Sequence, residues 1–169
     1  AIIADIDETI LNNLPYNEML IDSNLSFTQK TWAHWVNKQV ATPIPGALAF
    51  FNYVDSQDVE IIYLSNRRVE NYAPTKANLI AAGFPFYEDT MMLLRDEDGD
   101  KESRRNQLSD YNIVLLLGDN LADFDTRFHK KPNETRIAHV NSLRELFGDK
   151  FIVFPNLIYG TWEMGFTEQ

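Results

Sequence analysis

The sequence predicts an α/β fold, a doubly wound parallel sheet with a small helical lobe inserted after the first strand. Three observations predict it. Five short apolar runs have the character of buried strands, helical signals lie between them, and one long stretch after the first run does not fit this alternation. With 169 residues, 44% of them hydrophobic, the chain can form one compact domain with a sizeable core. We therefore expect residues 1–169 to form a single domain.

The expected strands are nearly continuous apolar runs, in which polar and apolar residues do not alternate. This pattern is typical of strands that are covered on both faces in a parallel sheet. The five runs are residues 2–4, 61–64, 91–94, 113–117 and 151–154.

Helical segments are expected between these strands. Proline suits the first position of a helix, and glycine commonly ends one. The expected helices are residues 47–54, which follow Pro45 and Gly46, a segment from Pro74 to Gly83, a charged surface helix over residues 101–108, and residues 143–147, closed by Gly148.

Residues 13–43 are the candidate helical lobe over the sheet. Two helices are expected in it, near residues 15–21 and 28–40. Ser26 and Gln29 have the spacing of a capping box at the start of the second helix.

Composition excludes several classes of protein. A net charge of −10 and a pI of about 4.7 argue against a nucleic-acid polymer or an anionic membrane surface as partner. No apolar run is long enough to cross a membrane. The absence of cysteine excludes disulfides, thiolate catalysis and cysteine-based zinc sites. If such an acidic chain handles phosphate, it needs a metal ion or a few placed cations at the site.

Polar side chains follow three of the expected strands, where ligands of open α/β sheets bind. Ser65 and Asn66 follow the second strand, and Lys101 opens the helix between the third and fourth strands. The acidic residues of the set are Asp5 and Asp7 after the first strand, and Asp119 and Asp123 after the fourth.

These residue types suit phosphoryl transfer. Asp5 is ionised at neutral pH and could attack phosphorus without a base, and Mg²⁺ held by Asp5 and Asp119 would offset its repulsion from phosphate. If the backbone stays extended, Asp7 projects on the same side and could protonate the leaving group. Phosphate-binding roles follow for Ser65, Asn66 and Lys101, as hydrogen-bonding groups and as a point charge.

With these residues in place, the chain resembles the haloacid dehalogenase superfamily, whose four motifs match Asp5 to Thr9, Ser65, Lys101 and Asp119 to Asp123. More narrowly, it resembles the class C acid phosphatases, the bacterial lipoprotein acid phosphatase and 5′-nucleotidase family. The segments that carry this second resemblance are residues 5–16, 63–67, 101–105, 118–124 and 151–162.

The resemblance implies a haloacid dehalogenase-like fold and a magnesium-dependent acid phosphatase. Asp5 would be the nucleophile that forms an aspartyl-phosphate, and Asp7 would be the acid/base and offer its backbone carbonyl to the metal. Asp119 would be a metal ligand, with Asp123 in support.

The implied substrates are small-molecule phosphomonoesters, including nucleoside 5′-monophosphates. The implied location is the bacterial outer membrane or periplasm, with membrane attachment only through a lipid anchor outside this chain. Asn12 departs from the acidic residue expected at its position.

These residues also allow other interpretations. Aspartates at strand ends can be ordinary turn or cap residues, and Lys101 has arginines nearby that could supply the charge instead. A signalling receiver domain is disfavoured because Ser65 stands where its phosphoacceptor aspartate would be, and a non-catalytic binding domain stays the alternative. None of the three histidines lies in a readable motif, which argues against histidine phosphatases and binuclear metallophosphoesterases.

Four aromatic residues lie outside the expected strands. Core packing of the small lobe is the favoured interpretation for Trp32 and Trp35. Tyr159 and Trp162 follow the last strand and are the better candidates for stacking against a nucleobase or another flat leaving group.

Overall fold

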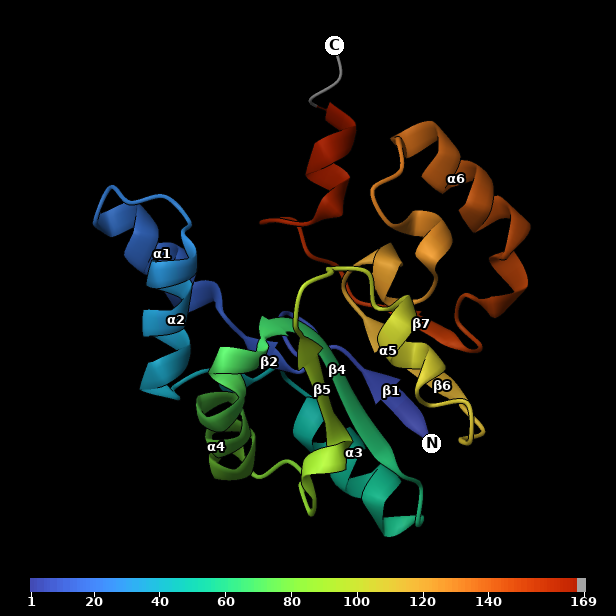
Figure 1. The fold of residues 1–169 in the computed structure, drawn as a ribbon, viewed down its shortest axis with the longest axis horizontal. Helices are drawn as coiled ribbons and strands as arrows, with labels where there is room; N and C mark the ends of the chain where they lie inside the picture. Colours follow the sequence, from blue (N-terminus) through green and yellow to red (C-terminus); the bar gives the residue numbers. More distant parts are fainter. Residues whose placement is uncertain (167–169) are drawn as a thin grey trace.

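A computed structural model of the protein describes residues 1–166, with side chains described through residue 163. Its centre is a five-stranded parallel sheet (Figure 1). The strands, in the spatial order of the sheet, are β5 (Met92–Arg95), β4 (Ile61–Arg68), β1 (Ile2–Ala4), β6 (Leu115–Gly118) and β7 (Phe151–Val153). This arrangement confirms the predicted doubly wound fold.

The register of the sheet follows from its apolar runs. Ile2 lies opposite Ile61 on one side and Leu115 on the other, so the first strand is central and buried on both faces. Strand β4 continues to Arg68, four residues beyond its expected end, and pairs there with Arg95 after a shift in register.

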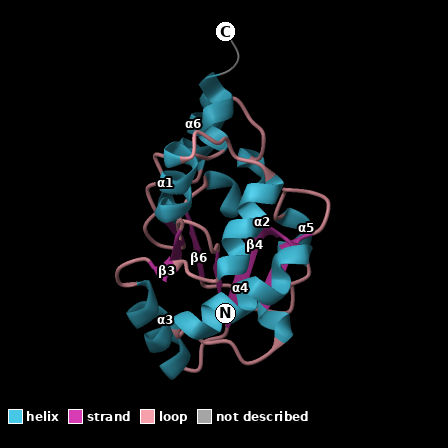
Figure 2. Ribbon diagram, turned by 90° about the vertical axis from the view of Figure 1, so that its left-hand side faces the viewer, coloured by secondary structure: helices cyan, strands magenta, loops and turns pink. Residues whose placement is uncertain are grey.

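Helices cover both faces of the sheet, and Figure 2 shows the strands running between them. Helices α3 (Ala47–Ser56) and α4 (Tyr72–Ala82) contribute apolar side chains to a core that includes Ile2 and Tyr63. A second core on the opposite face includes Ile3 and Ile62, and residues next to α5 (Glu102–Asn106) pack against it. The alternation of Ile2 and Ile3 between these cores explains why the run carries no polar residue.

The stretch expected to be helical does form two helices, α1 (Leu14–Asp22) and α2 (Gln29–Lys38), which stand apart from the sheet in Figure 1. The two-residue strands β2 (Leu11–Asn12) and β3 (Thr42–Pro43) pair antiparallel and join the two ends of this lobe. The expected capping box of Ser26 and Gln29 is wrong. Helix α2 begins at Gln29, so Thr28 is the cap and exchanges hydrogen bonds with Thr31.

Two further expectations about helices had different outcomes. Gly83 ends α4 with φ of +90°, a conformation that suits glycine, as predicted. Residues 143–147 form only the short turn η5 (Arg144–Leu146), and the real helix is α6 (Asn133–Ser142), just before it. Helix α6 was missed because most of its residues are polar or charged and it lies at the surface.

The remaining elements are short 3₁₀ turns. They are η1 (Val69–Asn71), η2 (Asp89–Met91), η3 (Leu121–Asp123), η4 (Thr126–Phe128) and η6 (Thr161–Phe166). Among the described residues, every helix is too short or too polar to span a bilayer.

Candidate active site

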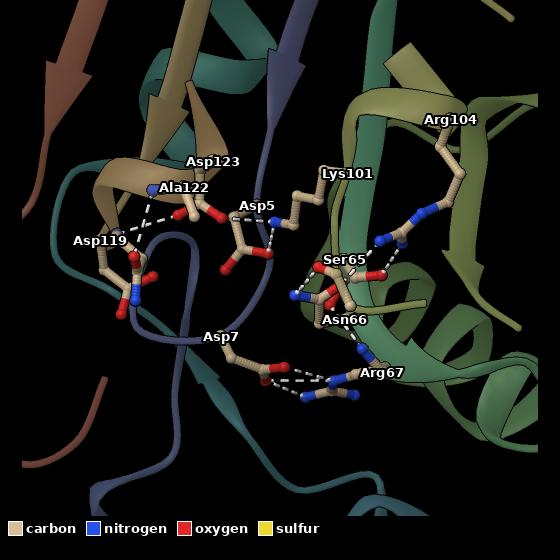
Figure 3. Close-up of polar contacts among 12 residues, drawn as sticks. Asp5, Asp7, Ser65, Asn66, Arg67, Lys101, Arg104, Asp119, Ala122 and Asp123 are labelled. Carbon is tan, nitrogen blue, oxygen red and sulfur yellow. Dashed lines mark hydrogen bonds and ion pairs between the residues drawn. The ribbon is translucent and has the colours of Figure 1, made fainter. Parts of the chain in front are cut away.

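The topology brings the predicted residues to one edge of the sheet. Strands β4, β1 and β6 are neighbours and parallel, so Ser65 within β4, Asp5 just after β1 and Asp119 just after β6 lie side by side (Figure 3). The N–H of Asp5 donates to the carbonyl of Leu117 (2.9 Å), which fixes its backbone to β6. Lys101 reaches the same place from the loop that follows β5.

The carboxylate of Asp5 is 9% exposed and lies against a buried cation. Lys101 Nζ is 2.5 Å from Oδ1 of Asp5 and 2.8 Å from Oδ1 of Asp123. Among the described residues, none donates a hydrogen bond to Oδ2 of Asp5, which points toward Asp119 in Figure 3. Burial raises the pKa of Asp5 well above its usual value, against the opposing effect of Lys101 and with help from Asp123 and Asp119.

The three clustered aspartates have the geometry of a cation site. One carboxylate oxygen from each of Asp5, Asp119 and Asp123 can be chosen so that all three lie within 4.8 Å of one another. Lys101 supplies one positive charge against three carboxylates. Burial raises the pKa of Asp119 to about 7, and the charge of Asp123 adds to this effect. Hard oxygen ligands with excess negative charge fit Mg²⁺ or a similar divalent cation.

The two aspartates that follow β6 are held differently. Asp119 accepts a hydrogen bond at Oδ2 from Nδ2 of Asn156 (2.7 Å), and no described residue donates to its Oδ1. Both oxygens of Asp123 are already engaged, one by Lys101 and the other by the N–H of Asn120 (2.9 Å). This difference suits Asp119 as a direct metal ligand and Asp123 as a support. Both roles stay predictions.

Position 118, directly before Asp119, has room only for glycine. A Cβ atom on Gly118 would lie 2.5 Å from Oδ2 of Asp123 and 2.6 Å from its Cβ. The absence of a side chain at Gly118 therefore lets Asp123 fold back against the end of β6.

Asp7 lies on a tight turn just beyond β1. The N–H of Ile10 closes this turn by donating to the carbonyl of Ile6 (3.0 Å), and Glu8 has φ of 56°. The backbone was expected to stay extended through Asp7. Asp7 does form a β-bridge with Leu11, but the chain turns immediately after it. Arg67 reaches the Asp7 carboxylate from β4 and donates to both of its oxygens (Figure 3).

Glu8, beside Asp7, is a half-buried acid to which the sequence assigned no role. Its Oε1 accepts the N–H of Asn13 (2.8 Å). Burial raises the pKa of Glu8 to about 8, the charge of Asp7 adds to this rise, and the hydrogen bonds from Asn13 oppose it.

Ser65 and Asn66 were expected to follow the second strand, but they lie within β4, where they form a hydrogen-bonded group with Arg67 and Arg104. The hydroxyl of Ser65, 1% exposed, accepts the N–H of Arg67 (3.1 Å) and keeps its own hydrogen available to a ligand. Both polar atoms of the Asn66 amide are engaged, because Nδ2 donates to the carbonyl of Gly99 (2.9 Å) and Oδ1 accepts from Arg104 (2.6 Å). Arg104 also donates to the Ser65 carbonyl (2.6 Å). The phosphate-binding roles of Ser65, Asn66 and Lys101 stay predictions.

The segment after β7 lies beside the same edge of the sheet. Asn156, which holds Asp119, also accepts the N–H of Tyr159 at its Oδ1 (3.3 Å). The indole N–H of Trp162 donates to the Tyr159 carbonyl (3.2 Å), and the Thr161 hydroxyl donates to Asn120 (2.8 Å). Both predicted stacking residues therefore lie in a segment anchored to Asp119 and its neighbour.

Comparison with known proteins agrees with this geometry. Residues 1–162 match the profile of HAD superfamily, subfamily IIIB (acid phosphatase). The chain belongs to this family. The match confirms the predicted haloacid dehalogenase superfamily.

Solved structures of the same kind are similar over almost the whole chain. A class C acid phosphatase from Bacillus anthracis with tungstate bound is 40% identical, with a TM-score of 0.92 over 98% of this chain and 70% of that chain. A second structure of the Bacillus anthracis enzyme is 38% identical with the same TM-score and coverage. These matches confirm the resemblance to class C acid phosphatases.

Relatives with longer chains come from plants. A stem 31 kDa glycoprotein of Glycine max is 32% identical over 141 residues, which is 76% of this chain and 56% of that protein. Acid phosphatase 1 of Solanum lycopersicum is 27% identical over 128 residues, 72% of this chain and 50% of that protein. The chain thus spans about half the length of these relatives.

Several residues of this HAD-family site were not assigned from the sequence. Arg67 was missed because the second strand was expected to end at Leu64. Had it been extended, alternation would have placed Arg67 on the same face as buried Ser65, as the burial pattern confirms. The sequence around Asn13 and Asn156 has no pattern that indicates a role in the site. Their hydrogen bonds to Asp7 and Asp119 depend on the folded path of the chain.

Proposed function

We propose that this chain is a phosphomonoesterase that hydrolyses its substrate through an aspartyl-phosphate on Asp5. The observation that carries the proposal is the buried Asp5 carboxylate, held at one oxygen by Lys101 and clustered with Asp119 and Asp123. The tungstate bound to the related Bacillus anthracis enzyme supports it, because tungstate is a tetrahedral oxyanion like phosphate.

The contacts of Asp5 suggest how the first step would proceed. Lys101 occupies Oδ1 of Asp5, which leaves Oδ2 to attack phosphorus. As the new O–P bond forms, the bond from phosphorus to the ester oxygen breaks, and Asp7 gives its proton to that oxygen. The Ser65 hydroxyl and the Lys101 ammonium group would hold the phosphoryl oxygens.

The second step returns the protein to its starting state. Asp7 accepts a proton from the water that attacks the aspartyl-phosphate. The O–P bond to Asp5 breaks, inorganic phosphate leaves, and Asp7 is again protonated for the next substrate.

We also propose Mg²⁺ as the cofactor. Asp5, Asp119 and the backbone carbonyl of Asp7 would hold it, with Asp123 in support. When bound, it would reduce the repulsion between the Asp5 carboxylate and the phosphate dianion.

Replacing the nucleophile tests the proposal. Asp5→Asn keeps the shape of the side chain but removes its nucleophilic charge, so turnover of a chromogenic phosphate ester with Mg²⁺ should be abolished. Asp58→Asn is the matched control, because Asp58 is exposed at the far end of α3 and should leave turnover unchanged. Full activity in the Asp5 variant, or wild-type protein that hydrolyses no phosphomonoester, would refute the proposal.

For the substrate class we propose small phosphomonoesters that include nucleoside 5′-monophosphates. The support is the position of Tyr159 and Trp162, in the segment that Asn156 and Thr161 anchor beside the aspartates. Stacking of a base on an aromatic ring is worth about 1–3 kcal/mol, so Tyr159→Ala or Trp162→Ala should raise KM for nucleotides about 5- to 100-fold.

A small aliphatic ester such as glycerol phosphate serves as the comparison substrate, because it has no flat ring to stack. Tyr53→Ala, which removes an exposed tyrosine of α3, should change KM for neither substrate. Equal effects of the Tyr159 and Trp162 variants on both substrates would contradict the stacking proposal.

An extracytoplasmic location with a lipid anchor outside this chain is proposed on the family resemblance alone. Labelling of the full-length protein in its host with a fatty-acid analogue tests it. A full-length protein that takes up no label would contradict the lipid anchor.

A further inference from the structure

The two oxygens of Asp7 have unequal surroundings. Oδ1 accepts three donors: Nη2 of Arg67 at 2.7 Å, Nε of Arg67 at 3.1 Å and Nδ2 of Asn13 at 2.8 Å. Among the described residues, Oδ2 receives only a share of the Arg67 Nε hydrogen, also at 3.1 Å. Since each carboxylate oxygen has two lone pairs, Oδ1 is saturated and Oδ2 keeps room for a proton.

Arg67 is held in place from three sides. Its side chain is 1% exposed, and Nη1 donates to the hydroxyl of Thr75 in α4 (3.1 Å). Its guanidinium carbon lies 5.6 Å from the ring centre of Trp32 in α2. These contacts hold the planar guanidinium in an orientation in which Nε lies equally far from both Asp7 oxygens and Nη2 donates to Oδ1.

The orientation of the Asn13 amide is also determined. The indole N–H of Trp35 donates to Oδ1 of Asn13 (2.8 Å), and Asn13 is completely buried. An indole N–H can only donate, so the oxygen of the amide must face Trp35 and the NH₂ group must face Asp7. Trp35, in helix α2, thus ensures that the NH₂ group of Asn13, and not its oxygen, faces Asp7.

We propose that Arg67 and Asn13 are positioning residues that leave Oδ2 of Asp7 as the oxygen that carries the proton. In the first step the O–H bond at Oδ2 breaks and its proton joins the ester oxygen as the P–O bond breaks. In the second step Oδ2 takes a proton from the attacking water. This inference rests on the proposed phosphomonoesterase activity and makes the small lobe part of the proton-transfer machinery.

The test compares leaving groups that differ in their need for a proton. A nitrophenyl phosphate leaves as a stable anion, whereas an alkyl phosphate such as glycerol phosphate leaves as an alkoxide that must be protonated. General acid catalysis contributes about 10²–10⁴-fold, so Arg67→Met should lower kcat for the alkyl ester about 10- to 100-fold more than for the aryl ester. KM for both esters should change much less than kcat.

Two further variants keep the inference testable if Arg67→Met does not fold. Arg67→Lys keeps the positive charge but lacks the fork, so aryl turnover and thermal stability should recover while alkyl turnover stays low. Trp35→Phe keeps the aromatic bulk but removes the donor that orients Asn13, and should cause a smaller loss with the same preference for the aryl ester.

A mutant cycle connects these effects to Asp7. In an Asp7→Asn background, Arg67→Lys should cause no further change in the ratio of alkyl to aryl turnover. Arg136→Met is the control, because Arg136 is also buried but hydrogen-bonds to Thr161 and Phe128, away from Asp7. It should lower stability without changing that ratio.

The outcomes separate this inference from the proposed function. An equal loss on both esters in the Arg67 and Trp35 variants, or a wild-type ratio in Arg67→Lys, would overturn the positioning role while Asp5→Asn remains inactive. Activity in Asp5→Asn would instead overturn the proposed function, and the inference with it.

Discussion

Asp119 is the residue whose ionised carboxylate should serve catalysis and at the same time lower the stability of the fold. Its carboxylate lies in a largely buried cluster with Asp5 and Asp123, and Lys101 contacts the other two but not Asp119. Without a divalent cation, ionised Asp119 should destabilise the fold. We therefore predict that Asp119→Asn makes the protein more stable in a chelator, while it abolishes catalysis.

The size of the effect follows from the pKa of this group. Burial and Asp123 raise the pKa of Asp119 from 3.8 to about 7. A difference of this size corresponds to roughly 4 kcal/mol against the ionised form. Because Asp119 stays partly exposed and shares its charge interactions with Asp123, about 1–3 kcal/mol is the expected gain. In a chain of this length that raises Tm by about 2–10 °C.

The pH dependence has a definite sign. A raised pKa means that the wild-type protein without metal loses stability as pH rises from about 4 to about 7 through ionisation of Asp119. The advantage of Asp119→Asn should therefore be small at pH 4, partial at pH 5 and fully developed at pH 8.

Thermal melting with a chelator and with Mg²⁺ measures the effect. The wild-type Tm should rise with Mg²⁺ more than that of Asp119→Asn. Asp125→Asn is the control, because the guanidinium of Arg127 lowers the pKa of Asp125 and the variant should gain no stability. The reasoning is wrong if Asp119→Asn is no more stable than wild type at pH 8 in chelator, or gains as much from Mg²⁺.

Three further predictions concern neighbouring residues. Gly118→Ala should cost about 1–3 kcal/mol of unfolding free energy in denaturant titrations, because its Cβ would overlap Asp123; unchanged stability would contradict the packing. Asn156→Ala should weaken Mg²⁺ binding to Asp119 about 10- to 100-fold in calorimetry, and an unchanged Kd would exclude an orienting role. Thr9→Val should raise stability in the same titrations by about 1 kcal/mol, because the buried Thr9 hydroxyl has no hydrogen-bond partner among the residues that the structure describes; a loss of stability would contradict this.

The sheet could be predicted from the sequence because its five apolar runs are short, dense and separated by helical segments. The outer parts were harder. Helix α6 buries little apolar surface, so its sequence from Asn133 to Ser142 has no apolar stripe to indicate it. The cap of α2 at Thr28 was assigned to Ser26 because both residue types cap helices, and only the position of the first helical turn decides between them.

The positions of Asp5 and Asp119 could be predicted because these residues follow strands β1 and β6 directly. Parallel strands place their carboxyl ends at one edge, so Asp5, Ser65 and Asp119 were expected together and are found together. The partners of these residues could not be predicted in the same way. The hydrogen bond from Asn156 to Asp119 spans 37 residues, and that from Arg67 to Asp7 spans 60. Such pairings depend on the folded path of the chain.

These partners explain how two aspartates only two residues apart can have different roles. Asp5 and Asp7 have the same chemistry and come from the same segment, so sequence position alone does not separate a nucleophile from an acid/base. Of these two aspartates, Asp5 is contacted by Lys101 and Asp7 by Arg67. The ammonium group binds one oxygen of Asp5 and would leave the other to attack, whereas the guanidinium fork binds Asp7. The division of roles that we propose therefore depends on which cation each carboxylate meets.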